Sequence, residues 1–372
     1  MSLFPSVEAC LSQAELIVDL GALVDNWRKL AARIAPAACA AVVKADAYGV
    51  GADEASRALL GAGCRVFFVA HPSEGARLRA VLGADAVIYV LNGLIEGEGR
   101  LAAYAAHALR PVLGSLSDVR LWSASGLAGQ HGAALHVDTG MNRLGLHRDE
   151  ALALAPQARA LGLDLVMSHF VSSEAPDDPI NARQIADFEA VRAAFAGLAA
   201  SMANSAGLFL PQRPFHDLAR PGYALYGGNP TPGAPNPMRA VVTLRAPIIQ
   251  TREIGVGESV GYNATWRAKR PSRLAAIGIG YADGLPRALM GTDAHSGGEA
   301  LVGGVRCPFV GRVSMDLTVI DVTDAPAPVR PGDLVELLGA AITVDDVAAR
   351  AGTIGYEILT SLGRRYARTY RN

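Results

Sequence analysis

The stretch "AVVKADAYGVG", residues 41–51, places a lysine directly after a run of small apolar residues. Alanine and valine in such a run are typical of a strand that is buried on both faces. Lysine is among the side chains that are least often buried, so Lys44 at the end of this strand calls for a chemical reason. Burial lowers the pKa of a lysine amine and makes it more nucleophilic near pH 7. We therefore treat Lys44 as a candidate nucleophile.

Apolar runs like the one before Lys44 recur about eight times over residues 1–235, with amphipathic stretches rich in alanine and leucine between them. This alternation predicts parallel strands joined by right-handed helical crossovers. Eight such units fit a closed (β/α)8 barrel of the TIM type, and a doubly wound open sheet is the alternative. The expected strands are residues 39–43, 66–70, 86–91, 109–114, 133–137, 163–167, 201–205 and 218–227.

The pattern changes near "GGNPTPGAPNPMRA", residues 227–240, which is dense in glycine and proline and typical of a domain boundary. Short strands and turns follow it, with one helical pattern near the end at residues 343–352. The sequence thus predicts an α/β fold with two domains. A (β/α)8 barrel is expected over residues 1–235, and a mostly β C-terminal domain over residues 236–372.

Charge and composition narrow the class of partner. The formal net charge of −1 offers no general attraction for nucleic acid or for an anionic membrane. No apolar stretch is long enough for a spanning helix, and the opening "MSLFPSVEACLSQAE" shows no basic leader before an apolar run. We expect a cytoplasmic protein that binds no nucleic acid, membrane or metal. The cysteines are scattered, as in a reducing compartment: Cys10, Cys39, Cys64 and Cys307.

Polar side chains follow the predicted barrel strands at the points where they end. The carboxyl ends of barrel strands meet at one face, where barrel enzymes carry their chemistry, so we expect one site there. Taken alone, a residue such as His71 is more often a satisfied structural histidine than a catalyst. The full set is Lys44, His71, Asn92, Ser115, Asp138, His169, Ser205 and Arg220.

The turns after the last two predicted strands favour a phosphate site. "ANSAG" offers the hydroxyl of Ser205, and "RPGYALYG" offers backbone N–H groups near Gly222. Loops at these positions commonly bind phosphate in such barrels, although an ordinary glycine turn has the same sequence features. A lysine and a phosphate site across one barrel suggest pyridoxal 5′-phosphate held as a Schiff base. A Schiff-base aldolase of a phosphorylated sugar would share both features.

The motif around Lys44 resembles the cofactor-lysine motif of alanine racemases, the pyridoxal-phosphate enzymes of fold type III. The resemblance continues in order through both domains in "VDTGMNRLGL", "MSHF", "ANSAG", "RPGYALYG", "GYNATW", "IGYADG", "GRVSMDLT" and "GYEILTSLGRR". It implies a homodimeric isomerase that interconverts L- and D-alanine with pyridoxal 5′-phosphate and supplies D-alanine for peptidoglycan. It also implies that the two subunits share their active sites.

The resemblance assigns two catalytic bases. Lys44 would bind the cofactor covalently and serve one face of the substrate, and Tyr262 would reach the partner subunit's site from the C-terminal domain. Racemisation needs two bases because the proton leaves one face and a proton returns to the other. Arg143 and Met315 would bind the substrate, and Tyr281 would line the entrance.

Other residues are assigned to the cofactor by the same resemblance. Arg220 would face the pyridine nitrogen with His169 beside it. A guanidinium cannot accept a proton, so the resemblance favours racemisation over transamination or decarboxylation. The phosphate would be held by Tyr48, Ser205, Gly222, Tyr223 and Tyr356.

One position departs from the family pattern. His136 stands where many members carry a carbamylated lysine that supports the arginine matched by Arg143, and histidine forms no stable carbamate. A chloride-like anion or another acidic side chain would neutralise Arg143, or Arg143 would be less fixed. The alternative functions are a racemase of another or several amino acids such as serine, a decarboxylase of the same fold type, and a non-catalytic cofactor carrier. Arg220 and Ser314 disfavour the decarboxylase, and the second domain disfavours the carrier.

Overall fold

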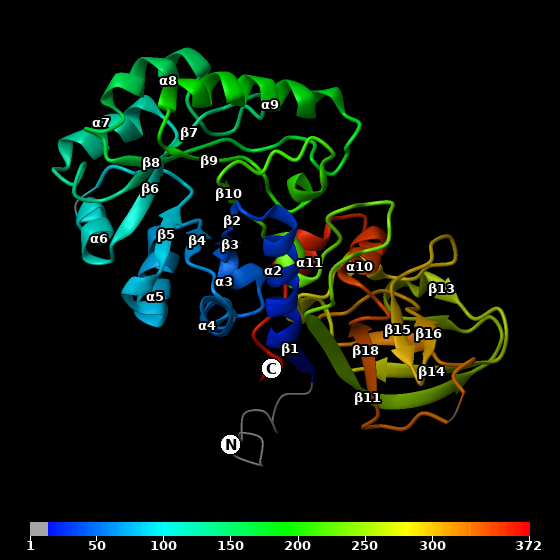
Figure 1. The fold of residues 1–372 in the computed structure, drawn as a ribbon. Helices are drawn as coiled ribbons and strands as arrows, with labels where there is room; N and C mark the ends of the chain where they lie inside the picture. Colours follow the sequence, from blue (N-terminus) through cyan, green and yellow to red (C-terminus); the bar gives the residue numbers. More distant parts are fainter. Residues whose placement is uncertain (1–13, 98, 327) are drawn as a thin grey trace. The chain divides into compact units, whose positions relative to one another are not determined.

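The computed structural model describes residues 14–97, 99–326 and 328–372, and the chain divides into two compact units (Figure 1). One unit comprises residues 23–225 and 229–238, and the other comprises residues up to 22, 226–228 and 239 onward. The expectations on an export leader and on Cys10 fall on residues 1–13, which lie outside the described residues.

The first unit is built on a curled parallel sheet whose strands follow chain order. A doubly wound sheet reverses its strand order, so this order rules out that alternative. Every pairing in the sheet is parallel. The seven strands are, in order, β3 (Ala41–Val42), β4 (Val66–Val69), β5 (Val87–Val90), β6 (Leu109–Leu113), β7 (Ala133–His136), β8 (Leu163–Met167) and β9 (Ala199–Ser201).

A short eighth strand completes the predicted order. β10 (Leu218–Ala219) pairs in parallel with β2 (Ala38–Cys39), which only Ala40 separates from β3. The N–H of Ala40 donates to the last carbonyl of β10 (2.9 Å), and on the other side the N–H of Arg220 donates to the carbonyl of Ala203 (2.9 Å). The barrel class expected from the sequence is therefore confirmed, as a seven-stranded parallel sheet and a short eighth strand.

Two predicted strands have the wrong extent. The strand expected at residues 201–205 lies at 199–201, because the Asn204 side chain accepts the N–H of Gly207 (2.8 Å) and starts a turn. The strand expected at 218–227 ends at residue 219, since Pro221 has no N–H for a ladder. A 3₁₀ turn, η5 (Tyr223–Tyr226), follows.

Helices cover the outside of this sheet, and Figure 1 shows α5 to α9 around strands β4 to β9. Aromatic side chains of the strands and helices, such as Phe67, Phe68 and Trp122, are fully buried in this unit. The helices are α2 (Leu20–Ile34), α3 (Lys44–Tyr48), α4 (Ala52–Ala62), α5 (Pro72–Leu82), α6 (Arg100–Ala106), α7 (Leu116–Ala124), α8 (Arg148–Leu154) and α9 (Pro179–Arg192), with 3₁₀ turns η1 (Gly83–Asp85), η2 (Ala155–Gln157), η3 (Ala193–Phe195) and η4 (Ala206–Phe209).

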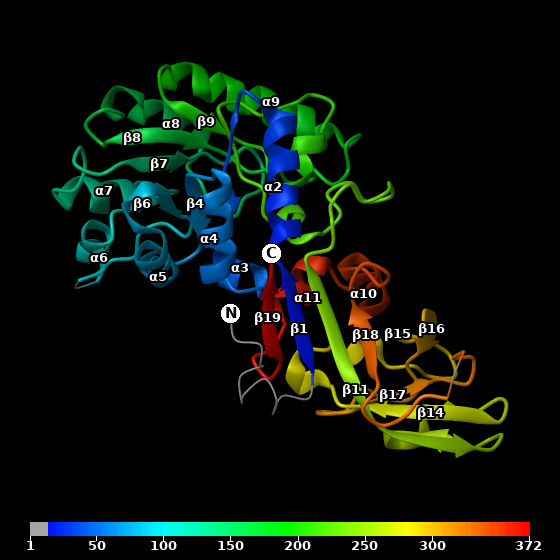
Figure 2. The ribbon, with the colours of Figure 1, turned by 60° about the horizontal axis from the view of Figure 1, so that its bottom comes forward.

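The second unit is mostly β, as predicted. Its long central strand β11 (Val242–Ile254) pairs with β1, β14 and β18, and Figure 2 shows β19, β1 and β11 side by side. The strands are β1 (Glu15–Asp19), β12 (Ser259–Val260), β13 (Trp266–Arg267), β14 (Ser272–Ile277), β15 (Glu299–Val302), β16 (Val305–Pro308), β17 (Thr318–Asp321), β18 (Leu334–Leu338) and β19 (Ala367–Arg371). The helical segments are α10 (Val344–Ala351), α11 (Gly355–Thr360), η6 (Tyr262–Ala264), η7 (Tyr281–Asp283) and η8 (Arg287–Leu289).

β1 belongs to this unit although it lies early in the chain. It pairs antiparallel with β11 and parallel with β19, and the whole barrel lies between β1 and these partners in the sequence. The range expected for the barrel, residues 1–235, thus includes one strand that pairs in the second unit. Among the described helices, none is both long and apolar enough to cross a membrane.

Candidate functional site

Lys44, at the carboxyl end of β3, is followed by a left-handed helical turn. Although α3 is helical in its hydrogen bonding, Ala45, Asp46, Ala47 and Tyr48 have φ of 53°, 55°, 53° and 55°. Each residue with a β-carbon costs about 1–2 kcal/mol in a left-handed turn. Backbone strain of this kind persists only where surrounding structure enforces it, and it is concentrated at functional sites.

Two carboxylates hold this left-handed turn. Glu74 accepts the N–H of Ala45 (2.7 Å) with one oxygen and the N–H of His71 (3.1 Å) with the other. The side chain of Asp46 accepts the N–H of Ala52 at the start of α4 (2.9 Å). The backbone on the C-terminal side of the lysine is therefore tied to the loop after β4 and to the next helix.

The Lys44 amine lies in an environment that favours its neutral form. The side chain is half-buried, and this burial lowers the pKa of Lys44. The positive charge of Arg143 lowers the same pKa, and the carboxylate of Glu74 partly opposes both effects. The direction of this shift is the one expected from the sequence, and a lowered pKa makes the amine a better nucleophile and base near neutral pH.

Ser205, Gly222 and Tyr48 come together beside this lysine. The buried Ser205 hydroxyl oxygen accepts the N–H groups of Gly222 (3.0 Å) and Ala224 (3.1 Å). A β-carbon at position 222 would clash with the Tyr48 hydroxyl oxygen and lie 2.8 Å from Cζ of that ring, so only glycine allows the ring to approach. Burial raises the pKa of Tyr48, which keeps its hydroxyl a hydrogen-bond donor. Hydroxyls and backbone N–H groups thus gather where a phosphate was expected.

Arg220 is a buried cation at the end of β10, with 4% of its surface exposed. Its guanidinium donates to the carbonyl of Ser168 (2.7 Å) and to the hydroxyl of Ser201 (2.5 Å), and lies 3.5 Å from Nδ1 of His169. These acceptors are neutral, and burial lowers the pKa of Arg220 to about 9. At this pKa the guanidinium keeps its charge near pH 7, so the residue donates hydrogen bonds and offers no proton acceptor.

His169 and His136 are neutral at pH 7. Burial and the positive charge of Arg220 lower the pKa of His169 to about 3 and the pKa of His136 to about 4. Arg143 lowers both further, whereas the carboxylate of Asp138 raises the pKa of His136. A neutral imidazole gives Arg143 no counter-charge.

Asp138 also builds the loop that carries Arg143. One carboxylate oxygen accepts the N–H groups of Gly140 and Met141 (both 2.8 Å), and the other accepts the N–H of Asn142 (2.9 Å). Arg143 follows these pinned residues with an exposed side chain, and its charge acts on the lysine and the two histidines described above. The loop therefore carries an exposed cationic side chain on a backbone that Asp138 holds in place.

Three predicted residues lie exposed on neighbouring loops of the second unit. Tyr262 is 69% exposed, Met315 54% and Tyr281 42%. The N–H of Tyr281 donates to the carbonyl directly before Met315 (3.0 Å). A β-carbon at Gly261 would lie 3.2 Å from the backbone nitrogen of Arg312, so the loop of Tyr262 packs against that same segment.

Two further residues of the second unit have simpler positions. Asp316 forms an ion pair with Arg365 (2.8 Å), the structural role that its exposed position suggests. Tyr356 lies half-buried in the first turn of α11.

Two of the polar residues expected at strand ends take part in helix starts. Ser115 caps α7 by accepting the N–H of Asp118 (3.0 Å). His71 is exposed at the start of α5, where its N–H is bound by Glu74. Three residues around these groups were not expected from the sequence: Glu74, Ser201 and Gln184. Only Glu74 carries a signal, because it stands three residues after a helix start, at the spacing of a capping box.

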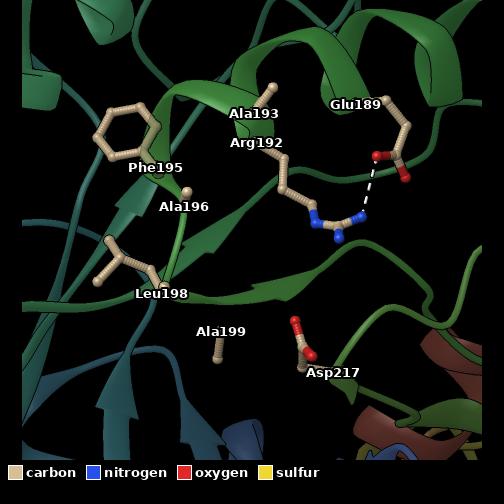
Figure 3. Close-up of a pocket in the computed structure, with 9 residues that line it drawn as sticks. Glu189, Arg192, Ala193, Phe195, Ala196, Leu198, Ala199 and Asp217 are labelled. Carbon is tan, nitrogen blue, oxygen red and sulfur yellow. Dashed lines mark hydrogen bonds and ion pairs between the residues drawn. The ribbon is translucent and has the colours of Figure 1, made fainter.

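A pocket of about 640 Å³ lies at the opposite end of the barrel strands (Figure 3). It is lined by Ala199, the first residue of β9, and by Asp217, which directly precedes β10. Figure 3 shows Arg192 reaching toward Glu189, with which it pairs at 3.0 Å. None of the residues predicted for the site lines this pocket.

The donors at the barrel mouth fit a phosphorylated carbonyl cofactor. Ser205, Tyr48 and the N–H groups near Gly222 can donate to a phosphate, and the amine of Lys44 can attack a carbonyl. In the part of the chain that the structure describes, no three His, Cys, Asp or Glu side chains form a group that could hold a metal ion.

Comparisons with known proteins lead to one family. The family models "Alanine racemase, N-terminal domain" and "Alanine racemase, C-terminal domain" match residues 18–230 and 241–370. An alanine racemase of Methylobacterium nodulans is 58% identical over 96% of each chain. The crystal structure of alanine racemase from Bartonella henselae with covalently bound pyridoxal phosphate is 39% identical, with a TM-score of 0.89 over 97% of this chain and 100% of that one. The biosynthetic alanine racemase from Pseudomonas aeruginosa is 36% identical, with a TM-score of 0.89 and the same coverage.

Proposed function

This chain belongs to the alanine racemase family, and from that premise we propose which of its residues racemise alanine. The enzyme depends on pyridoxal 5′-phosphate and interconverts L- and D-alanine; a racemase for other amino acids is not favoured. The observation that carries the residue assignment is the contact of Tyr48 with Gly222. It brings the turn that starts at Lys44 against the turn that donates N–H groups.

Lys44 would hold the cofactor covalently. The phosphate would be bound by the hydroxyls of Ser205 and Tyr48 and by the N–H groups of Gly222 and Tyr223, with Tyr356 as a further ligand. Pyridoxal phosphate, when bound, withdraws electrons from the α-carbon of the amino acid and makes its proton removable. The protein has then to remove that proton on one face and supply a proton on the other.

Two bases on opposite faces would carry out this exchange. The Lys44 amine would accept or return the α-proton on one face, and its lowered pKa supports that role at neutral pH. The phenol of Tyr262 would serve the other face. Its 69% exposure leaves the ring free to enter another subunit's barrel.

Arginines would set the fate of the substrate. Arg143 would bind the carboxylate from its exposed position on the loop after β7. Arg220 would donate to the pyridine nitrogen without protonating it. Full electron withdrawal into the ring would then be avoided, and transamination and decarboxylation would be suppressed.

We also propose a homodimer in which each barrel is completed by the partner subunit. Support comes from the exposed patch of Tyr262, Tyr281 and Met315, because aromatic and methionine side chains are enriched in such interfaces. Tyr262 and Met315 would act in the partner's site, and Tyr281 would line its entrance. In the cytoplasm the product D-alanine would supply peptidoglycan synthesis.

Optical rotation tests the activity. The purified protein is incubated with pyridoxal phosphate and L-alanine, and the rotation should decay to zero while the alanine concentration stays constant. A parallel reaction with L-serine should be much slower. Unchanged rotation of alanine, or faster racemisation of serine, would contradict the function.

A further inference from the structure

Gln184 is a fully buried amide on α9, next to the end of β8. Its Oε1 accepts the N–H of Val171 (2.9 Å), and its Nε2 donates to the carbonyl of His169 (3.0 Å) and to Oγ1 of Thr139 (3.1 Å). Both amide hydrogens of Gln184 are thus hydrogen-bonded. An apolar side chain would have filled the same buried space without the cost of desolvating a polar group.

These contacts fix the orientation of the amide. The backbone N–H of Val171 can only donate and the carbonyl of His169 can only accept, so the oxygen and nitrogen of Gln184 cannot be exchanged. The hydroxyl of Thr139 accepts from Gln184 (3.1 Å) and shares a hydrogen bond with the hydroxyl of Ser168 (2.7 Å). A chain of hydrogen bonds thus runs from Gln184 on α9 through Thr139 to Ser168.

The same chain reaches two parts of the active site. Thr139 directly follows Asp138, the carboxylate that pins the loop of Arg143. Ser168 offers its carbonyl to the guanidinium of Arg220 (2.7 Å) and directly precedes His169. Gln184 therefore joins the base of the substrate-binding loop to the strand end that supports the cofactor.

We propose that Gln184 is a positioning residue that sets the register between Arg143 at the substrate and the His169–Arg220 pair at the cofactor. The proposal rests on the proposed function, since those three residues act on substrate and cofactor only in that account. Loss of the amide would let the Arg143 loop and the end of β8 move independently. A misplacement of about 1 Å at a reacting centre costs on the order of a hundredfold in rate.

The chain offers a matched control one turn earlier on the same helix. Asn181 is also fully buried, but its amide donates to the carbonyls of Ser172 (3.2 Å) and Ala175 (2.9 Å), in the loop before α9. Its amide hydrogen bonds go to this loop and not to Thr139 or Ser168. Asn181→Leu removes a buried amide of the same helix without touching the proposed connection.

The test compares Gln184→Met, Thr139→Val, the double variant and Asn181→Leu in the full-length holoenzyme. Gln184→Met and Thr139→Val should each raise KM for both alanine enantiomers by roughly tenfold to a hundredfold and shift the visible absorbance of the bound cofactor. The double variant should be no worse than the worse single variant, because both break one connection. Asn181→Leu should lose thermal stability but keep the wild-type KM and absorbance.

Wild-type KM and absorbance in the Gln184 and Thr139 variants, or effects that multiply in the double variant, would overturn the proposal. So would an Asn181→Leu enzyme with the same KM change, since the effect would then be general loosening of α9. If Gln184→Met does not fold, Thr139→Val alone still decides, because it removes one hydroxyl at nearly constant volume. A wild-type protein that does not racemise alanine would instead refute the function, while the absorbance would still report on Gln184.

Discussion

Gly222 tolerates no side chain, because a β-carbon there would clash with the hydroxyl end of the Tyr48 ring. We predict that Gly222→Ala displaces either the Tyr48 ring or the N–H that donates to Ser205, and overpacking of this kind costs about 1–3 kcal/mol. Affinity for pyridoxal phosphate should fall by roughly 5- to 150-fold, since about 1.4 kcal/mol corresponds to a tenfold change in affinity. Titration of cofactor-free protein, followed by absorbance, measures this.

Gly61 provides the control for that substitution. It lies in α4, and an added β-carbon would meet no atom within 4 Å. Gly61→Ala should leave cofactor affinity unchanged and stabilise the helix by about 0.5–1 kcal/mol. If both variants bound pyridoxal phosphate like the wild type, the turn at Gly222 would not be the phosphate site.

At the scale of single elements, the left-handed turn after Lys44 is the most strained segment of the barrel mouth. Ala45 is exposed at φ 53°, where a β-carbon costs about 1–2 kcal/mol. Ala45→Gly relieves this strain but adds flexibility to the unfolded chain, which costs up to about 1 kcal/mol. The free energy of unfolding should therefore rise by roughly 0.5–1 kcal/mol in urea titrations.

Ala45→Val tests the same element in the opposite direction. A β-branched side chain is still less tolerated at positive φ, so this variant should be less stable than the wild type by more than about 1 kcal/mol, the penalty per left-handed residue. A destabilised Ala45→Gly would mean that residue 45 does not adopt the left-handed conformation in solution.

The sequence predicted the barrel elements better than the turns between them. Parallel strands buried on both faces leave continuous apolar runs, so β4, β5, β6 and β8 stand close to the expected ranges. The left-handed turn could not be predicted from the sequence, because "KADAY" contains no glycine, the residue that usually adopts a positive φ. The pairing of β1 with β11 and β19 depends on partners beyond the entire barrel in the sequence, which local periodicity does not report.

For the whole molecule, stability should depend on pH through two half-buried histidines, His136 and His169. The folded protein keeps His136 neutral down to a pKa of about 4 and His169 to about 3, whereas an unfolded histidine titrates near 6.5. Between these values the unfolded chain binds more protons, so the free energy of unfolding falls as the pH drops from 6.5 toward 4. The contribution of His136 alone is on the order of 2 kcal/mol.

Urea unfolding of the cofactor-free protein at pH 8, 6.5 and 5 measures this dependence. His136→Gln should lose less stability between pH 6.5 and 5 than the wild type, because one proton-binding group of the unfolded chain is gone. Identical pH slopes for both proteins would show that His136 is accessible and titrates normally in the folded state.

The candidate site residues of the first unit could be predicted from the sequence pattern, whereas those of the second unit could not. In the barrel, strand ends pointed to Lys44, His169, Ser205 and Arg220, because parallel strands bring their carboxyl ends to one face. Tyr262 and Met315 lie on exposed loops of the second unit and follow no pattern of that kind. Only the resemblance to a family assigned them, since exposed aromatic residues have no periodicity that distinguishes a base from a surface side chain.

The assignment of Lys44 and Tyr262 to opposite faces is tested most directly by α-proton exchange in D₂O. Tyr262→Phe should keep the cofactor absorbance and still exchange the α-proton of D-alanine, because Lys44 serves that face. Its exchange of the L-alanine proton should fall by about 10²–10⁴-fold, the usual contribution of a positioned base. Exchange of both enantiomers at nearly wild-type rates would contradict the two-base account and remove Tyr262 from it.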